Sequence, residues 1–175
     1  MSNYNIKSTV ITNRDATPSR LTDAIKSKSY AYEAIGVERV PQSADIGSTI
    51  RLLSMPSSGR LSGLEYAYHG MGSAAVFDVA AWYPTAVATQ SGAVAAALIS
   101  SSFVGANFSF VVDTGAGWTD AMGTVALNPV AEREQPLWQL LGLVADPGID
   151  LDLGFTIRTT NTLAGYCGLR ARYSR

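Results

Sequence analysis

The chain has 175 residues, a length that suits one compact domain. Only 15% of its residues are charged, against roughly 25% in an ordinary soluble domain, so short polar side chains and contacts with partners are expected to cover much of its surface. The net charge of −1 gives no positive field that would attract nucleic acid or an anionic membrane. The most apolar run, residues 92–99, is too short to span a bilayer. We therefore expect no nucleic acid and no membrane among its partners.

The amino terminus lacks the apolar segment of a secretory signal. The only cysteine, Cys167, cannot form an intrachain disulfide. Both features predict that the protein is made in a cytoplasm.

Residues 1–45 are polar, are interrupted by Pro18 and Pro41, and follow no sustained period of strand or helix. They predict an extended amino-terminal arm, within which residues 19–25 could form a short helix by packing. The remaining residues, 46–175, predict one β-sandwich domain.

Short β-like runs separated by turn residues begin after residue 45. Residues 50–55 and 61–68, joined by Pro-Ser-Ser-Gly, predict two adjacent strands, and residues 74–83 predict a third. Residues 86–102 favour a short helix, since alanine is a strong helix former. Residues 107–112 predict a strand, and a loop through residues 115–128 is a candidate contact surface.

Residues 136–144 carry the clearest helical signal, with Pro136 in the first turn and Leu137, Leu140, Leu141 and Val144 at helical spacing. Residues 151–158 and 166–173 then alternate strictly between apolar and other residues. We expect these two strands to form a hairpin, with Phe155 opposite Leu169 and Asp152 opposite Arg172. The predicted fold is mainly β, an antiparallel sandwich with one or two short helices.

Residues for catalysis or metal binding are few. His69 is the only histidine, and no G-x-S-x-G motif surrounds any serine. A hydrolase that acts through His69 is therefore the weaker alternative, and we expect His69 to be a loop residue at the end of a strand. Asp146, Asp150 and Asp152 lie close in sequence but lack the spacing of a calcium loop. No nucleotide-binding glycine motif is present. We therefore expect no enzyme, no cofactor and no metal.

Aromatic and basic side chains offer two kinds of binding surface. Trp82, Tyr83, Trp118 and Trp138 could stack on sugar rings, although Trp138 is expected in the core or an interface and Trp82 over the edge of the sandwich. A basic stripe of four arginines is equally consistent with partner contact and with a solvated face of cross-strand ion pairs. Its members are Arg158, Arg170, Arg172 and Arg175.

Several segments resemble head structural proteins of podovirus-like tailed phages. They are residues 13–18 (NRDATP), 47–57 (GSTIRLLSMPS), 135–143 (QPLWQLLGL) and 145–148 (ADPG), followed by the closing strand 164–173. The likeness follows the same order along nearly the whole chain. It departs most in residues 86–131, which are rich in Ala, Gly and Ser.

Proteins that the chain resembles include decoration or cement proteins with jelly-roll cores. The resemblance implies binding to the outside of the phage head, where the protein would bridge major capsid protein subunits as a dimer or trimer and stabilise the shell. It implies no catalytic residues. The alternatives are a carbohydrate-binding jelly-roll module for host adsorption and another minor virion structural protein. Candidate partner-binding residues are Tyr4, Arg14, Pro18 and Arg20 in the arm and Arg158, Arg170 and Arg172 in the stripe.

Overall fold

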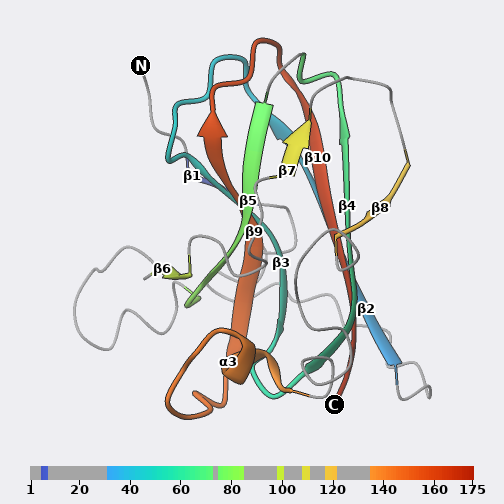
Figure 1. Ribbon diagram of the computed structural model, residues 1–175, viewed down its shortest axis with the longest axis vertical. Helices are drawn as coiled ribbons and strands as arrows, with labels where there is room; N and C mark the ends of the chain where they lie inside the picture. Colours follow the sequence, from blue (N-terminus) through green and yellow to red (C-terminus); the bar gives the residue numbers. More distant parts are fainter. Residues whose placement is uncertain are drawn as a thin grey trace, which may run out of the picture.

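The computed structural model describes residues 5–7, 31–72, 75–84, 98–100, 108–110, 117–121 and 135–175. Within these residues the protein is a sandwich of two β-sheets that enclose a hydrophobic core (Figure 1). Sheet B contains, in spatial order, β2 (Ala31–Val40), β10 (Gly165–Ser174), β4 (Arg60–His69) and β8 (Thr119–Asp120). Sheet A is built on β3 (Thr49–Pro56), β9 (Asp150–Thr159) and β5 (Ala75–Trp82). The short strands at its edges are β1 (Asn5–Lys7), β6 (Leu98–Ser100) and β7 (Phe108–Phe110). The mainly β sandwich predicted from the sequence is confirmed.

The order of the strands is that of a jelly roll. The antiparallel pairs β2 with β10, β3 with β9, β4 with β8, and β5 with β6 and β7 are those of one long hairpin. Further pairing of β4 with β10 and of β5 with β9 rolls this hairpin into two sheets. Strands far apart in the sequence thus become neighbours, and the rings of Tyr32 and Tyr173 stack with their centroids 5.5 Å apart.

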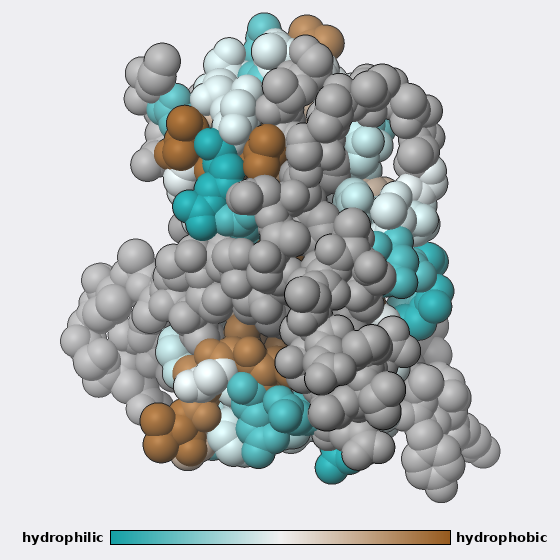
Figure 2. Space-filling model, viewed as in Figure 1, coloured by the Kyte–Doolittle hydropathy of each residue, from teal (hydrophilic) through white to brown (hydrophobic). Residues whose placement is uncertain are grey.

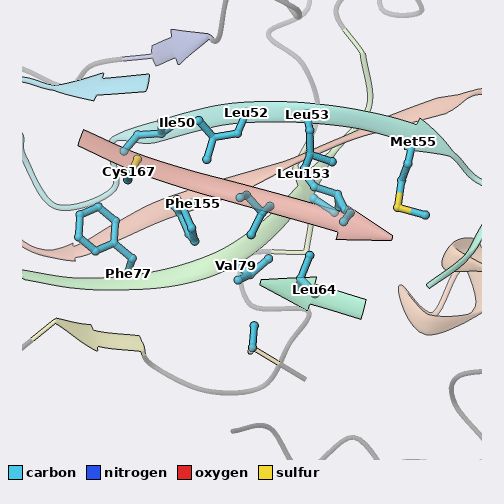
Figure 3. Close-up of a cluster of buried hydrophobic side chains, with 14 of the residues drawn as sticks. Ile50, Leu52, Leu53, Met55, Leu64, Phe77, Val79, Leu153, Phe155 and Cys167 are labelled. Carbon is cyan, nitrogen blue, oxygen red and sulfur yellow. The ribbon is translucent and has the colours of Figure 1, made fainter. Parts of the chain in front are cut away.

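The core lies between the two sheets and is filled by large aliphatic and aromatic side chains. Figure 3 shows side chains from both sheets meeting there, including Ile50, Leu64, Phe155 and Cys167. The rings of Phe77 and Phe155 meet edge to face with centroids 5.8 Å apart, a favoured geometry for buried aromatic pairs. This packing holds both sheets as a rigid support for their outer faces.

The two sheets differ in how their outer faces are covered. All residues of β9 from Leu151 to Ile157 are buried, so sheet A is covered on both faces along this strand. Even polar side chains on the outer face of this strand are buried. Asp152 is buried beside Arg51, whose Nη1 lies 3.7 Å from the Asp152 Oδ2. Sheet B has exposed side chains on its outer face, on alternate positions of β2 and β10.

The helix near the carboxyl end of the chain is shorter than predicted. Helix α3 (Leu137–Leu140) begins after Pro136, and Leu137 is buried. Gly142 has a φ of 70°, a left-handed conformation that ends helices. Val144 is therefore outside the helix and fully exposed, so the prediction that it belongs to the helix is wrong.

Strand positions were predicted better than strand pairing. The strands expected at 50–55, 61–68, 74–83, 151–158 and 166–173 are confirmed as β3, β4, β5, β9 and β10. The predicted hairpin of the last two is wrong, because β9 belongs to sheet A and β10 to sheet B. The first two are not adjacent either, since β3 and β4 also lie in different sheets. Their connections cross the end of the sandwich instead of turning within one sheet.

Part of the predicted arm is a strand of the sandwich. Strand β2, within residues 1–45, pairs with β10 along its entire length. Of the helix expected in residues 86–102, the described residues 98–100 form β6. The described part of the loop 115–128 carries β8. The short helix expected at residues 19–25 lies outside the described residues.

Candidate functional site

The outer face of sheet B is the candidate site. Side chains alternate across each strand, and the pairing of β2, β10 and β4 aligns the outward ones in rows. The outward positions are Glu33, Ile35, Val37 and Arg39 of β2; Tyr166, Gly168, Arg170 and Arg172 of β10; and Gly63, Glu65, Ala67 and His69 of β4. This set is called the B face below.

Large apolar side chains on the B face are exposed. Ile35 is 46% exposed, Val37 is 53% exposed and Tyr166 is 52% exposed, although each lies in a regular strand of a folded sheet. Exposed apolar surface that is continuous over neighbouring strands is typical of protein contact sites.

A shallow hollow lies in the middle of the B face. Gly168 pairs with Val37 on one side and with Ala67 on the other, so the row has little side-chain volume at its centre. The hollow has a volume of about 160 Å³ and is also lined by Tyr166 and His69. It is large enough for one small apolar side chain of a partner.

Trp118 lies against the same glycine. A β-carbon on Gly168 would come within 3.0 Å of the Trp118 Cη2 and within 3.1 Å of the Val37 Cγ2. The glycine therefore lets the indole approach the sheet. On its other side the ring faces the Arg170 guanidinium, whose Cζ is 4.9 Å from the ring centroid, a cation–π contact.

A chain of cross-strand ion pairs borders this apolar surface. Arg170 donates to the Glu65 carboxylate, and Arg172 Nη2 lies 3.4 Å from the Glu65 Oε1. Arg172 Nε donates to the Glu33 Oε2 over 3.1 Å. The carboxylate of Glu65 thus joins two arginines of β10 and fixes their orientation.

The candidate partner-binding residues from the sequence lie in three places. Arg170 and Arg172 are together on the B face, where the cross-strand ion pairs considered for the stripe are present. Arg158 lies on sheet A and pairs with Asp78, a residue only 2% exposed. Partner contact by these three arginines stays a prediction. Tyr4, Arg14, Pro18 and Arg20 lie outside the described residues.

The acidic and histidine residues considered for chemistry have other surroundings. His69 is exposed at the end of β4. Asp146 accepts hydrogen bonds from the Ser57 hydroxyl and from the Gly148 amide, which hold the pKa of its carboxyl below the usual range. Within the described residues, no three His, Cys, Asp or Glu side chains are grouped so as to hold a metal ion.

Trp82 is buried, and its expected place at the sandwich edge is wrong. It is 2% exposed, and its ring centroid lies 5.8 Å from the Arg51 Cζ. A sugar ring therefore cannot stack on this buried side chain. Trp118, in contrast, lies beside the hollow of the B face.

Comparisons with protein-family models, with curated proteins and with solved structures found no match to this chain. No helix among the described residues is long and apolar enough to cross a membrane.

The arrangement of the B face suits binding. Its apolar residues are exposed, its hollow is mainly apolar, and its charged groups are oriented by neighbours on the same sheet. Sequence reasoning missed Ile35 and Val37 because β2 was not expected as a strand. The alternation that placed Tyr166 on the outer side of its strand was the signal available for that residue.

Proposed function

We propose that this protein is a phage capsid decoration, or cement, protein that binds the outside of the head and bridges major capsid subunits. The B face is its contact surface in this proposal. The observation that carries it is the exposure of three large apolar side chains, Ile35, Val37 and Tyr166, on neighbouring strands of sheet B.

The physical argument begins with the cost of ordering an interface. Arg170 and Arg172 are already held by Glu65, and Trp118 already rests against Gly168. Binding therefore loses little side-chain entropy. Aromatic and arginine side chains are also the types enriched at the centres of protein interfaces. The charged groups of the B face are paired with each other. The apolar hollow is therefore the proposed anchor point for a side chain of the partner.

The choice of partner rests on the resemblance to podovirus-like head proteins. That resemblance favours the major capsid protein, a position on the outer surface of the virion after synthesis in the host cytoplasm, and self-association as a dimer or trimer. The proposed role is mechanical and needs no enzymatic activity. Many copies with modest affinity suffice, because multivalent attachment raises the apparent affinity by roughly 10² to 10⁴.

Co-sedimentation with filled heads stripped of this protein tests the proposal. A Tyr166→Ser variant should lose occupancy by about tenfold or more, as expected for an aromatic residue at the centre of an interface. Val144→Ser is the matched control, since Val144 is an exposed apolar residue that lies beyond α3. Figure 1 shows α3 at the lower end of the sandwich, and Figure 2 shows hydrophobic surface at this end. Equal retention of both variants, or a wild-type protein that does not bind heads, would refute the proposal.

The proposed contribution of the arm needs a deletion that keeps the long strands of the sandwich. Because β2 begins at Ala31, removing residues 1–30 keeps these strands and takes away only the three-residue edge strand β1 of sheet A. Loss of head occupancy with an unchanged circular dichroism spectrum is the expected result. Unchanged occupancy would exclude the arm from the contact.

A carbohydrate-binding module is the second candidate. The observation that favours it is Trp118 beside the hollow, with Tyr166 at the hollow's wall. A glycan array decides between the two: selective sugar binding that Trp118→Ala abolishes would support this function. The apolar lining of the hollow favours a protein partner, because sugar hydroxyls need polar partners.

A further inference from the structure

Strand β2 is the edge of sheet B, and its free side carries backbone groups that can pair with another strand. Among the described residues, no strand pairs with β2 on the side away from β10. β2 is ten residues long and its outward side chains include exposed Ile35 and Val37. Long, apolar edge strands of this kind are templates for strand addition.

The direction of the free backbone groups can be inferred from one hydrogen bond. The Arg39 amide donates to the Glu38 Oε1 over 3.0 Å, so it points away from β10. In an antiparallel ladder, amide and carbonyl groups of alternate residues point to the same side. Glu33, Ile35 and Val37 therefore present their amides and carbonyls to the free edge as well.

The outward side chains of β2 are complementary to themselves in reverse order. They run from acidic Glu33 through Ile35 and Val37 to basic Arg39. We propose that β2 pairs antiparallel with β2 of a second copy of this chain about a twofold axis at Gly36. Ile35 then lies opposite Val37 of the second copy, and Glu33 lies opposite Arg39 of the second copy.

Other registers are less favourable. Opposed residues of antiparallel strands share a face, so the strands can shift only by steps that keep outward residues opposite outward residues. A shift of this kind in either direction places Glu33 opposite Val37 or Ile35 opposite Arg39. Parallel pairing through the same edge would turn the two B faces to opposite sides of the joined sheet, so Glu33 of one copy could not meet Arg39 of the other. The twofold register alone satisfies both charges.

The local structure of the proposed pair fits this register. Gly36 meets Gly36 of the second copy at a position without paired backbone bonds, where opposed strands approach most closely. Glu33 uses Oε2 for Arg172 of its own chain, which leaves Oε1 for Arg39 of the second copy. In the single chain, the Arg39 amide donates a hydrogen bond to the Glu38 carboxylate. In the pair, the same amide donates to the Glu33 carbonyl of the second copy instead.

The pairing joins two B sheets into one continuous sheet and places two B faces side by side. The pairing gives a specific geometry for the proposed self-association. Its role in attaching the protein to heads rests on the proposed function, whereas the dimer itself does not. One pair of edge strands is smaller than a standard interface of about 1,600 Å², so the dimer is expected to be weak and concentration-dependent.

Charge exchange between two variants tests the pairing. Sedimentation equilibrium of the full chain, without heads, measures the dimer constant over a range of concentrations. Glu33→Lys and Arg39→Glu each place like charges opposite each other twice per dimer and should weaken the dimer at least tenfold. An equimolar mixture of the two variants restores dimers, because both cross pairs then join opposite charges.

Arg60→Glu is the control, because Arg60 is exposed on β4 with β10 between it and β2. Thermal melting checks that each variant is folded, since Glu33→Lys also removes the contact with Arg172. A wild-type chain that stays monomeric at millimolar concentration overturns the inference, as does a trimer or a mixture that fails to recover dimers. Head binding is measured separately with Tyr166→Ser, so either proposal can fail without the other.

Discussion

The backbone at Gly36 lies directly against the carbonyl of Leu52. A β-carbon on Gly36 would be 2.0 Å from that oxygen and 2.4 Å from the carbonyl carbon. This close approach brings β2 of sheet B onto β3 of sheet A. The absence of a side chain at residue 36 therefore determines how closely the sandwich closes at this corner.

Gly36→Ala is expected to destabilise the fold. The added methyl group meets backbone atoms that cannot rotate away, so the strands must separate, at a cost of about 1–3 kcal/mol or more. Urea unfolding followed by circular dichroism measures the change. Gly63→Ala is the matched control on β4, because its nearest neighbour is the Arg172 Cβ at 3.8 Å, an ordinary contact. Equal stability of the two variants would contradict the role of Gly36.

Gly168→Val is expected to displace Trp118 from the B face. The branched side chain occupies the space where the indole Cη2 and the Val37 methyl now lie. An indole that moves into water emits at longer wavelength, so the fluorescence maximum should shift to the red. The same substitution in a Trp118→Phe background should leave the emission of Trp82 and Trp138 unchanged. A red shift that persists there would show that the sandwich itself has been disturbed.

The sequence was sufficient to predict the long strands of the core and insufficient to predict their partners. Alternating apolar residues identify the face of a strand, and this signal located β9 and β10. The link between them at residues 160–164 is as short as a hairpin loop, yet it crosses from sheet A to sheet B. Which strands pair depends on contacts between segments far apart in the sequence, and local alternation carries no signal of these contacts. The pairing of β2 with β10 is an example.

The sequence pattern did not identify strand β2, because both of its faces carry apolar residues. Tyr32 and Val40 lie on one side of it and Ile35 and Val37 on the other, so apolar residues occur at both parities and the period-two signal cancels. The four positions that β2 contributes to the B face were therefore missed. The arginines of β10 were identified because they alternate with core residues, but their carboxylate partners lie on β2 and β4, far away in the sequence.

Glu65→Gln is expected to reduce stability more than Glu33→Gln. The side chains of Glu65 and Arg170 are 20% and 21% exposed, whereas those of Glu33 and Arg172 are 43% and 49% exposed. Ion pairs in water are worth about 0.2–1 kcal/mol, and partial burial of a charged hydrogen bond raises this to about 1.5–3 kcal/mol. Urea unfolding of both variants at low and high salt measures the difference. A larger loss for Glu33→Gln would contradict this ranking.

Arg158→Leu is expected to destabilise the protein, and head co-sedimentation tests whether Arg158 also contacts the capsid. Arg158 donates to the Asp78 carboxylate, and Asp78 is 2% exposed with Oδ1 unsatisfied. Loss of the arginine leaves a buried carboxylate with neither oxygen paired, which costs about 1–3 kcal/mol or more. Thermal melting and head co-sedimentation are measured on the same preparation. Weaker binding at unchanged stability would instead place Arg158 in the capsid contact.

Alkaline pH is expected to unfold the protein through groups that are kept neutral in the core. Burial raises the pKa of the Cys167 thiol above its ordinary value of about 9, and burial also raises the pKa values of Tyr66 and Tyr173 above about 10. The unfolded chain releases these protons first. The stability that the neutral groups contribute is therefore complete below pH 9 and declines as pH rises, by up to about 1.4 kcal/mol per pH unit for each group.

Urea midpoints measured from pH 8 to pH 11 test this expectation. Cys167→Ala removes the thiol that ionises first, so its midpoint should decline less steeply between about pH 9 and 10 than that of the wild type, whatever its absolute stability. Above that range both proteins decline together, because the tyrosines are unchanged. An identical slope for both proteins between these pH values would show that the unfolded thiol does not drive the transition.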